Sequence, residues 1–181
     1  VREMERAKQL DPTSVVIVTS LVFAYDGAER WSEAEAMADQ SRALSRDHPL
    51  VILFADFMHD ANHRHLERLP TDIRRIAQSR AWRTAALGWD SAAALDVERR
   101  FGDPAQRATA VREIASQSPF FGLILHLAYD GDEATITYLG SLVGTPKAAE
   151  LADWVAYGLL GPRRRADPRF QAVLVRLGIP Q

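Results

Sequence analysis

The sequence from Thr13 to Pro49 reads TSVVIVTSLVFAYDGAERWSEAEAMADQSRALSRDHP. An apolar segment runs to Tyr25, a turn that contains glycine follows, and an Ala-rich segment continues until shortly before Pro49. Leu21, Ala24 and Tyr25 are spaced i, i+3, i+4, so they share one face of a helix. The stretch therefore predicts two helices that are joined by a short turn and pack against each other.

Proline and glycine divide the rest of the chain into segments of one helix each. Residues that favour helices dominate, and the alternation typical of strands is nearly absent. The chain is therefore predicted to be all-α, with short connections between antiparallel neighbours. No Gly/Ser-rich linker is present, so we expect a single domain over 1–181. The expected helices span 2–10, 13–26, 31–46, 50–62, 70–86, 91–101, 104–117, 119–130, 132–143, 147–160 and 168–177.

One tetrapeptide occurs twice, as residues 24–27 and again as residues 128–131, both reading AYDG. The separation is close to three units of about 35 residues, a period typical of α-solenoids. A third turn, residues 101–104, lies between the two copies at the same kind of junction. The order of helix, glycine-containing turn, Ala-rich helix and proline indicates repeated helix pairs.

The first pair resembles the tetratricopeptide repeat (TPR). The residues near the large, small and proline positions of that family are Leu21, Tyr25, Ala36, Ala43, Leu44 and Pro49. The resemblance implies an α-α superhelix, a TPR-like solenoid of about five antiparallel helix pairs.

The C-terminal segment reads as a capping helix. Asp167 suits the N-cap, Pro168 the first helical position and Gly178 the position after the helix. An apolar stripe is formed by Phe170, Val173, Leu174 and Leu177. The segment is similar to the closing helix of TPR modules at the C-terminal ends of bacterial multidomain regulators, namely class III adenylate cyclases, winged-helix transcription regulators and Ser/Thr kinases. The resemblance implies a C-terminal fragment of a longer protein.

Composition excludes several classes of function. The absence of cysteine rules out disulfides, thiolate metal sites and cysteine nucleophiles. The net charge of −2 gives no general reason to bind nucleic acid or anionic membranes. The most apolar stretch, 15–25, has about half the length of a transmembrane helix. We therefore expect no membrane insertion by this segment and a cytoplasmic location, or a periplasmic one if a membrane helix precedes it.

An Arg-rich stretch covers residues 62–83. It is interpreted either as a basic patch with an aromatic residue or as a solvated helix, and the isoelectric point near 6.2 argues against a nucleic-acid partner. The residues concerned are Arg64, Arg68, Arg74, Arg75, Arg80, Arg83 and Trp82.

A histidine-rich stretch, residues 58–65, reads MHDANHRH. His59 and His63 are spaced i, i+4 and can bind Zn²⁺ when a third ligand converges on them. The pattern is superficially similar to the HExxH signature, but Asp60 replaces the glutamate and no downstream ligand has the usual spacing. We expect surface histidines at a helix C-terminus and no metal. A separate histidine, His126, is expected to be half-buried on its helix.

The preferred interpretation is a non-catalytic protein-interaction module of a bacterial signalling or transcription regulator. It has no cofactor and binds a protein, a peptide or the upstream domains of its own chain, and a homodimer is left open. The alternative is a metal-dependent helical hydrolase that uses His59 and His63. In a TPR-like groove, the partner-binding residues are expected to be Thr19, Phe23, Asp26, Met58, His59 and Asn62. Whether Phe23 lines the groove or belongs to the core is left open.

Overall fold

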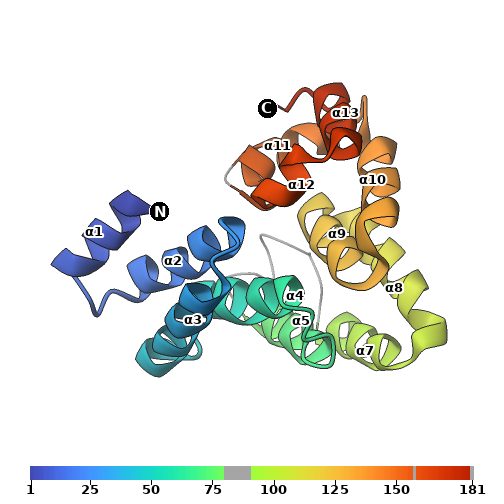
Figure 1. Ribbon diagram of the computed structural model, residues 1–181. Helices are drawn as coiled ribbons and strands as arrows, with labels where there is room; N and C mark the ends of the chain where they lie inside the picture. Colours follow the sequence, from blue (N-terminus) through green and yellow to red (C-terminus); the bar gives the residue numbers. More distant parts are fainter. Residues whose placement is uncertain (80–90, 157, 180–181) are drawn as a thin grey trace.

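The computed structural model describes residues 1–79, 91–156 and 158–179 (Figure 1). Within these ranges every regular element is a helix and no strand occurs, so the predicted all-α class is confirmed. Again within these ranges, no helix is long and apolar enough to span a membrane. The end of the predicted helix 70–86 lies outside the described residues, and so do Arg80, Trp82 and Arg83 of the Arg-rich stretch.

Within each of the described ranges, the helices follow one another through turns and short loops (Figure 1). Two segments, η1 and η3, are π-helical. The first continues directly into α4, and the second follows directly from α9. In chain order the elements are α1 (Arg2–Leu10), α2 (Val15–Gly27), α3 (Trp31–Ser45), η1 (Val51–Met58), α4 (His59–Asn62), α5 (Leu69–Gln78), α7 (Ser91–Gly102), α8 (Pro104–Gln117), α9 (Pro119–Leu125), η3 (His126–Asp130), α10 (Gly131–Leu142), α11 (Pro146–Ala156), α12 (Pro162–Ala166) and α13 (Pro168–Arg176).

Helix starts coincide with local capping signals. Ser14 accepts a hydrogen bond from the backbone N–H of Ile17, and Asp167 accepts one from Arg169. Such caps satisfy N–H groups that the first turn of a helix leaves unpaired. Prolines occupy the first positions of α8, α9, α12 and α13, where a missing N–H costs nothing.

The first hairpin, α2 with α3, uses a different register from the one expected. Ala34, Ala38 and Ser41 are the buried residues of α3, whereas Ala36 and Ala43 are exposed. Ala36 and Ala43, which lie near small positions of the TPR pattern, therefore do not lie at the contact with α2. All these small residues are compatible with a helix, so the packing partner alone decides which of them approach α2.

The main core joins both halves of the chain. Aromatic side chains from four elements meet at the junction, and Phe23 of α2 lies 5.4 Å from Phe54 of η1 between ring centroids. Trp154 of α11 contacts both rings, and it lies 4.4 Å from Phe120 of α9. Burial of these large apolar surfaces ties α2 and η1 to α9 and α11.

The C-terminal helix α13 forms as predicted. Asp167 caps it, and Phe170, Val173 and Leu174 are buried in the main core. Gly178 follows with a φ of +75°, a conformation that favours glycine.

Candidate functional site

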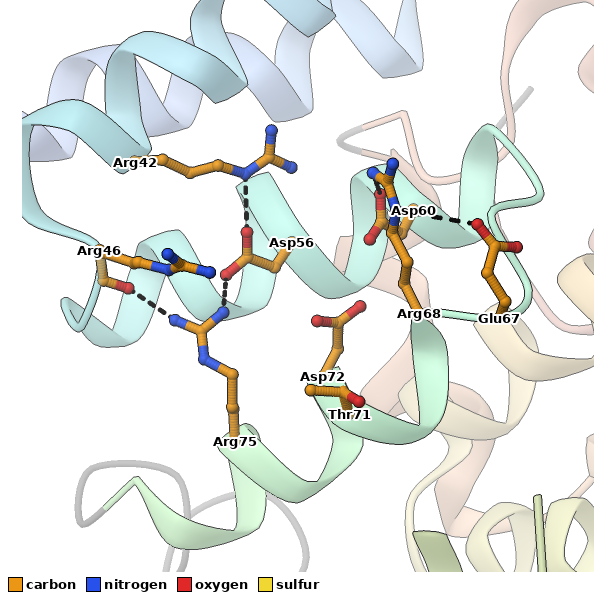
Figure 2. A pocket seen from close by; sticks show the side chains of 9 residues that line it. All are labelled: Arg42, Arg46, Asp56, Asp60, Glu67, Arg68, Thr71, Asp72 and Arg75. Atoms are coloured by element: carbon orange, nitrogen blue, oxygen red, sulfur yellow. Dashed lines mark hydrogen bonds and ion pairs between the residues drawn. The ribbon is translucent and has the colours of Figure 1, made fainter. Parts of the chain in front are cut away.

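A charged pocket opens between α3, η1, α4 and α5 (Figure 2). Its volume is about 450 Å³, in the range of small-ligand sites. Four basic and four acidic residues line it: Arg42, Arg46, Arg68, Arg75, Asp56, Asp60, Glu67 and Asp72.

Local helix geometry brings the carboxylates together. Asp56 and Asp60 are four residues apart on the continuous helical segment formed by η1 and α4, so both face the pocket. Asp72 and Arg75 are three residues apart on α5 and point towards them (Figure 2). A π-helical segment such as η1 is frequent at functional sites, because it changes which side chains share a face.

Two of the three buried aspartates are satisfied by ion pairs. Asp56 accepts a hydrogen bond from Nε of Arg42 at 2.9 Å and another from Arg75. Asp60 accepts from Arg68 at 3.3 Å and lies 3.0 Å from Nδ1 of His65. These pairs offset the cost of removing the charges from water.

Asp72 differs from its neighbours. Its side chain is 5% exposed, and its Oδ2 atom has no hydrogen-bond partner in the described part of the chain. Burial and the charges of Asp60 and Asp56 together raise the pKa of Asp72 to about 8, against the opposing effect of Arg75. The carboxyl of Asp72 is therefore largely protonated at neutral pH and lies in a pocket that has room for a ligand.

On another face of the same segment, two histidines meet an aspartate from α2. Nδ1 of His59 lies 3.1 Å from Oδ2 of Asp26, and Nε2 of His63 lies 3.1 Å from Oδ1 of Asp26. Nε2 of His59 lies 2.9 Å from Oε2 of Glu35 on α3. Within the described ranges, Asp26, His59 and His63 are the group of side chains whose geometry could hold a metal ion.

The electrostatics of this cluster favour positive charge on the imidazole of His59. Burial by itself lowers the pKa of His59, but the carboxylates of Asp26 and Glu35 outweigh it and leave that pKa above its usual value. The hydrogen bond with His59 lowers the pKa of Glu35.

The structure corrects the expectation of surface histidines. His59 is completely buried, because α2 and α3 cover it through Asp26 and Glu35. His63 is partly exposed and lies edge-on to the ring of Trp31, with 5.2 Å between ring centroids. His126 is half-buried, as predicted, and pairs with Asp130 at 2.8 Å.

The residues predicted to contact a partner lie mostly in the interior. Thr19 is buried and donates a hydrogen bond to Ser41 at 3.2 Å, and Met58 is 2% exposed. Asp26 and His59 are buried as described above, whereas Phe23 and Asn62 are partly exposed. The assumed groove register was therefore wrong for the four buried residues, which face neighbouring helices.

The arginines of the predicted basic patch are mostly neutralised where the structure describes them. Arg74 pairs with Glu98 at 3.2 Å, while Arg68 and Arg75 pair with pocket aspartates. Arg64 is exposed in a turn. An interspersed arrangement of this kind does not form the single-sign surface that a nucleic acid requires.

The charged pocket was not predicted from the sequence. A usable signal was present, because Asp56 and Asp60 interrupt an apolar segment at the spacing of one helical turn.

Comparisons with models of protein families, with curated proteins and with solved structures find no match to this chain. The site is therefore interpreted from its own geometry.

Proposed function

We propose that this chain is a non-catalytic protein-interaction module with a TPR-like arrangement of helix pairs, part of a bacterial signalling or transcription regulator. Its partner, a peptide segment or a neighbouring domain, inserts a cationic side chain into the charged pocket. The observation that carries this proposal is the unpartnered Oδ2 atom of the buried Asp72. A buried carboxyl oxygen without a partner is costly, so a cationic donor from a ligand would relieve that cost, and its binding would release to solvent the proton that Asp72 holds at neutral pH.

The chemistry of the pocket selects the ligand. Arginines already pair with Asp56 and Asp60, so Asp72 is the aspartate of the pocket that remains for a donor, which favours a lysine or arginine side chain of the partner over a neutral one. Arg46 lines the same pocket and takes part in none of its ion pairs described above. It is available for a carboxylate or backbone carbonyl of the partner, so a segment of mixed charge fits best.

A non-catalytic role is favoured over the metal-dependent hydrolase. Asp56 and Asp60 of the pocket are held by arginines. In the histidine cluster, Asp26 and His59 are covered by packed helices and His63 is only partly exposed, which leaves little surface for a substrate to approach a hydrolytic metal.

The proposal is tested with two small probes that differ in one charge. Acetyl-arginine amide and its neutral isostere acetyl-citrulline amide are titrated into the ¹⁵N-labelled full chain, and backbone amide shifts are followed by NMR. We expect shifts around the pocket with the arginine probe, weaker ones with citrulline, and loss of the arginine response in Asp72→Asn. Asp153→Asn removes an exposed carboxylate outside the pocket and serves as the matched control.

Equal responses to the two probes would argue against recognition of a cation. An unchanged arginine response in Asp72→Asn would show that this carboxyl is not the binding group.

A further inference from the structure

The cluster of Asp26, His59 and His63 has a geometry that a hydrogen-bond network alone does not require. One ligand atom from each residue can be chosen so that all three lie within 4.8 Å of one another. The two contacts of Asp26 with the imidazoles are both 3.1 Å, through different carboxylate oxygens. Ligands at about 2.0–2.1 Å from a tetrahedral zinc ion stand about 3.3 Å apart. The single atom Oδ1 of Asp26 has this spacing to both imidazoles, at 3.3 Å from Nδ1 of His59 and 3.1 Å from Nε2 of His63, while the three atoms together lie within 4.8 Å.

The hydrogen bond from His59 to Glu35 determines which imidazole nitrogen can bind a cation. The carboxylate of Glu35 accepts hydrogen bonds only, so Nε2 of His59 carries the hydrogen at this 2.9 Å contact. In neutral His59, Nδ1 is then a lone-pair acceptor that faces a second acceptor, the carboxylate of Asp26. A cation must lie between these two groups, and it is either a proton or a metal ion.

Glu35 also has the position of an outer-sphere partner. Histidines that bind metals commonly donate their other ring N–H to a carboxylate, which orients the ring and makes the ligand more basic. The ring of His59 is held in this way from α3 while its other nitrogen faces Asp26 on α2. His63, one helical turn later, presents Nε2 to the same aspartate.

We propose that Asp26, His59 and His63 form a binding site for a divalent transition-metal ion of the Zn²⁺ class. Two imidazoles and one carboxylate are a borderline donor set that suits zinc and its neighbours better than magnesium or calcium. A water molecule completes the coordination on the partly exposed side of His63. The bound ion cross-links α2 to α4, and its role is structural. The inference is independent of the proposed function, because the charged pocket lies on other residues.

The test uses the full chain without a histidine tag, after treatment with a chelator. ZnCl₂ is titrated by isothermal calorimetry, and CoCl₂ is added separately to record visible absorption, which is intense for four-coordinate cobalt. We expect one zinc ion per chain with a dissociation constant below about 1 μM, in keeping with a preformed three-ligand site, and an intense cobalt spectrum. Octahedral, weakly absorbing cobalt or the absence of one-to-one zinc binding would overturn the proposal.

Variants separate this site from other histidine–carboxylate pairs. His63→Gln removes a partly exposed ligand, and we expect at least a 100-fold loss of zinc affinity. Glu35→Gln should weaken binding by about 10- to 100-fold, as outer-sphere substitutions do. His126→Gln is the matched control, because His126 also pairs with an aspartate at 2.8 Å but has no third ligand there in the described chain.

Unchanged affinity in His63→Gln would refute the site, as would an equal loss in His126→Gln. Circular dichroism of each variant shows whether it is folded. If His63→Gln does not fold, the stoichiometry and the cobalt spectrum of the unmodified chain still decide the question.

Discussion

Replacement of Asp72 by asparagine should change how the stability of the protein depends on pH. Asp72 is buried and its pKa is raised to about 8 by burial and by the charges of Asp60 and Asp56. Asparagine has nearly the same shape as the protonated aspartate but does not titrate. The other titratable or charged groups around Asp72 are Tyr129 of η3 and, in the pocket, Arg42, Arg46, Arg68, Arg75 and Glu67.

The sign of the effect follows from the two pKa values of Asp72. In the unfolded chain the carboxyl loses its proton near pH 4, whereas in the folded chain it keeps the proton up to about pH 8. Between these values the folded state binds more protons, so the free energy of unfolding decreases as the pH rises. One pH unit corresponds to about 1.4 kcal/mol for a single group, so the loss from pH 5 to pH 7 is about 3 kcal/mol.

Urea unfolding of the original chain and of Asp72→Asn at pH 5, 6 and 7 measures this contribution. We expect the advantage of Asp72→Asn over the original chain to increase by about 3 kcal/mol between pH 5 and pH 7. Asp153→Asn, which removes an exposed carboxylate, should parallel the original chain. Parallel pH profiles for the original chain and Asp72→Asn would refute the argument, because Asp72 would then titrate as an ordinary surface aspartate.

Two further pairs of variants test the packing. Phe170→Ala removes a fully buried ring from α13 and should lower the free energy of unfolding by about 3–5 kcal/mol. Val175→Ala on the same helix changes a side chain that is 63% exposed, and should alter that free energy by less than about 0.5 kcal/mol. Equal effects in chemical denaturation would contradict the assigned face of α13. Gly27→Ala places a methyl group 2.8 Å from the carbonyl oxygen of Gly158 and should cost about 1–3 kcal/mol. Gly140→Ala lies in a helix with open space around the new methyl and should stabilise by about 0.5–1 kcal/mol; thermal unfolding distinguishes the two signs.

Much of the local structure was predictable, because the signals that start and stop helices act within one turn. Asp167 and Pro168 predicted the start of α13, and Gly178 predicted its end. The contact register of α3 was not predictable in this way. Ala34, Ala36, Ala38 and Ala43 favour a helix equally, and only the position of α2 decides which of them are buried.

In the charged pocket and the histidine cluster, likewise, the local spacing was predictable from the sequence and the partner from another helix was not. The i, i+4 spacing of His59 and His63 is visible in the sequence, but their shared partner, Asp26, is 33 residues before His59. Asp56 and Asp60 likewise share a helical face, while Asp72 reaches them only through the packing of α5.

The sequence by itself determined that this chain is helical, where its helices begin and how its C-terminal helix is capped, because propensity and capping depend on neighbours a few residues away. The tertiary structure alone decided that His59 is an interior residue and that three aspartates share one pocket with four arginines. The physical reason is that burial and charge pairing depend on which helix faces come together. That choice is set by the summed packing of segments far apart in the chain.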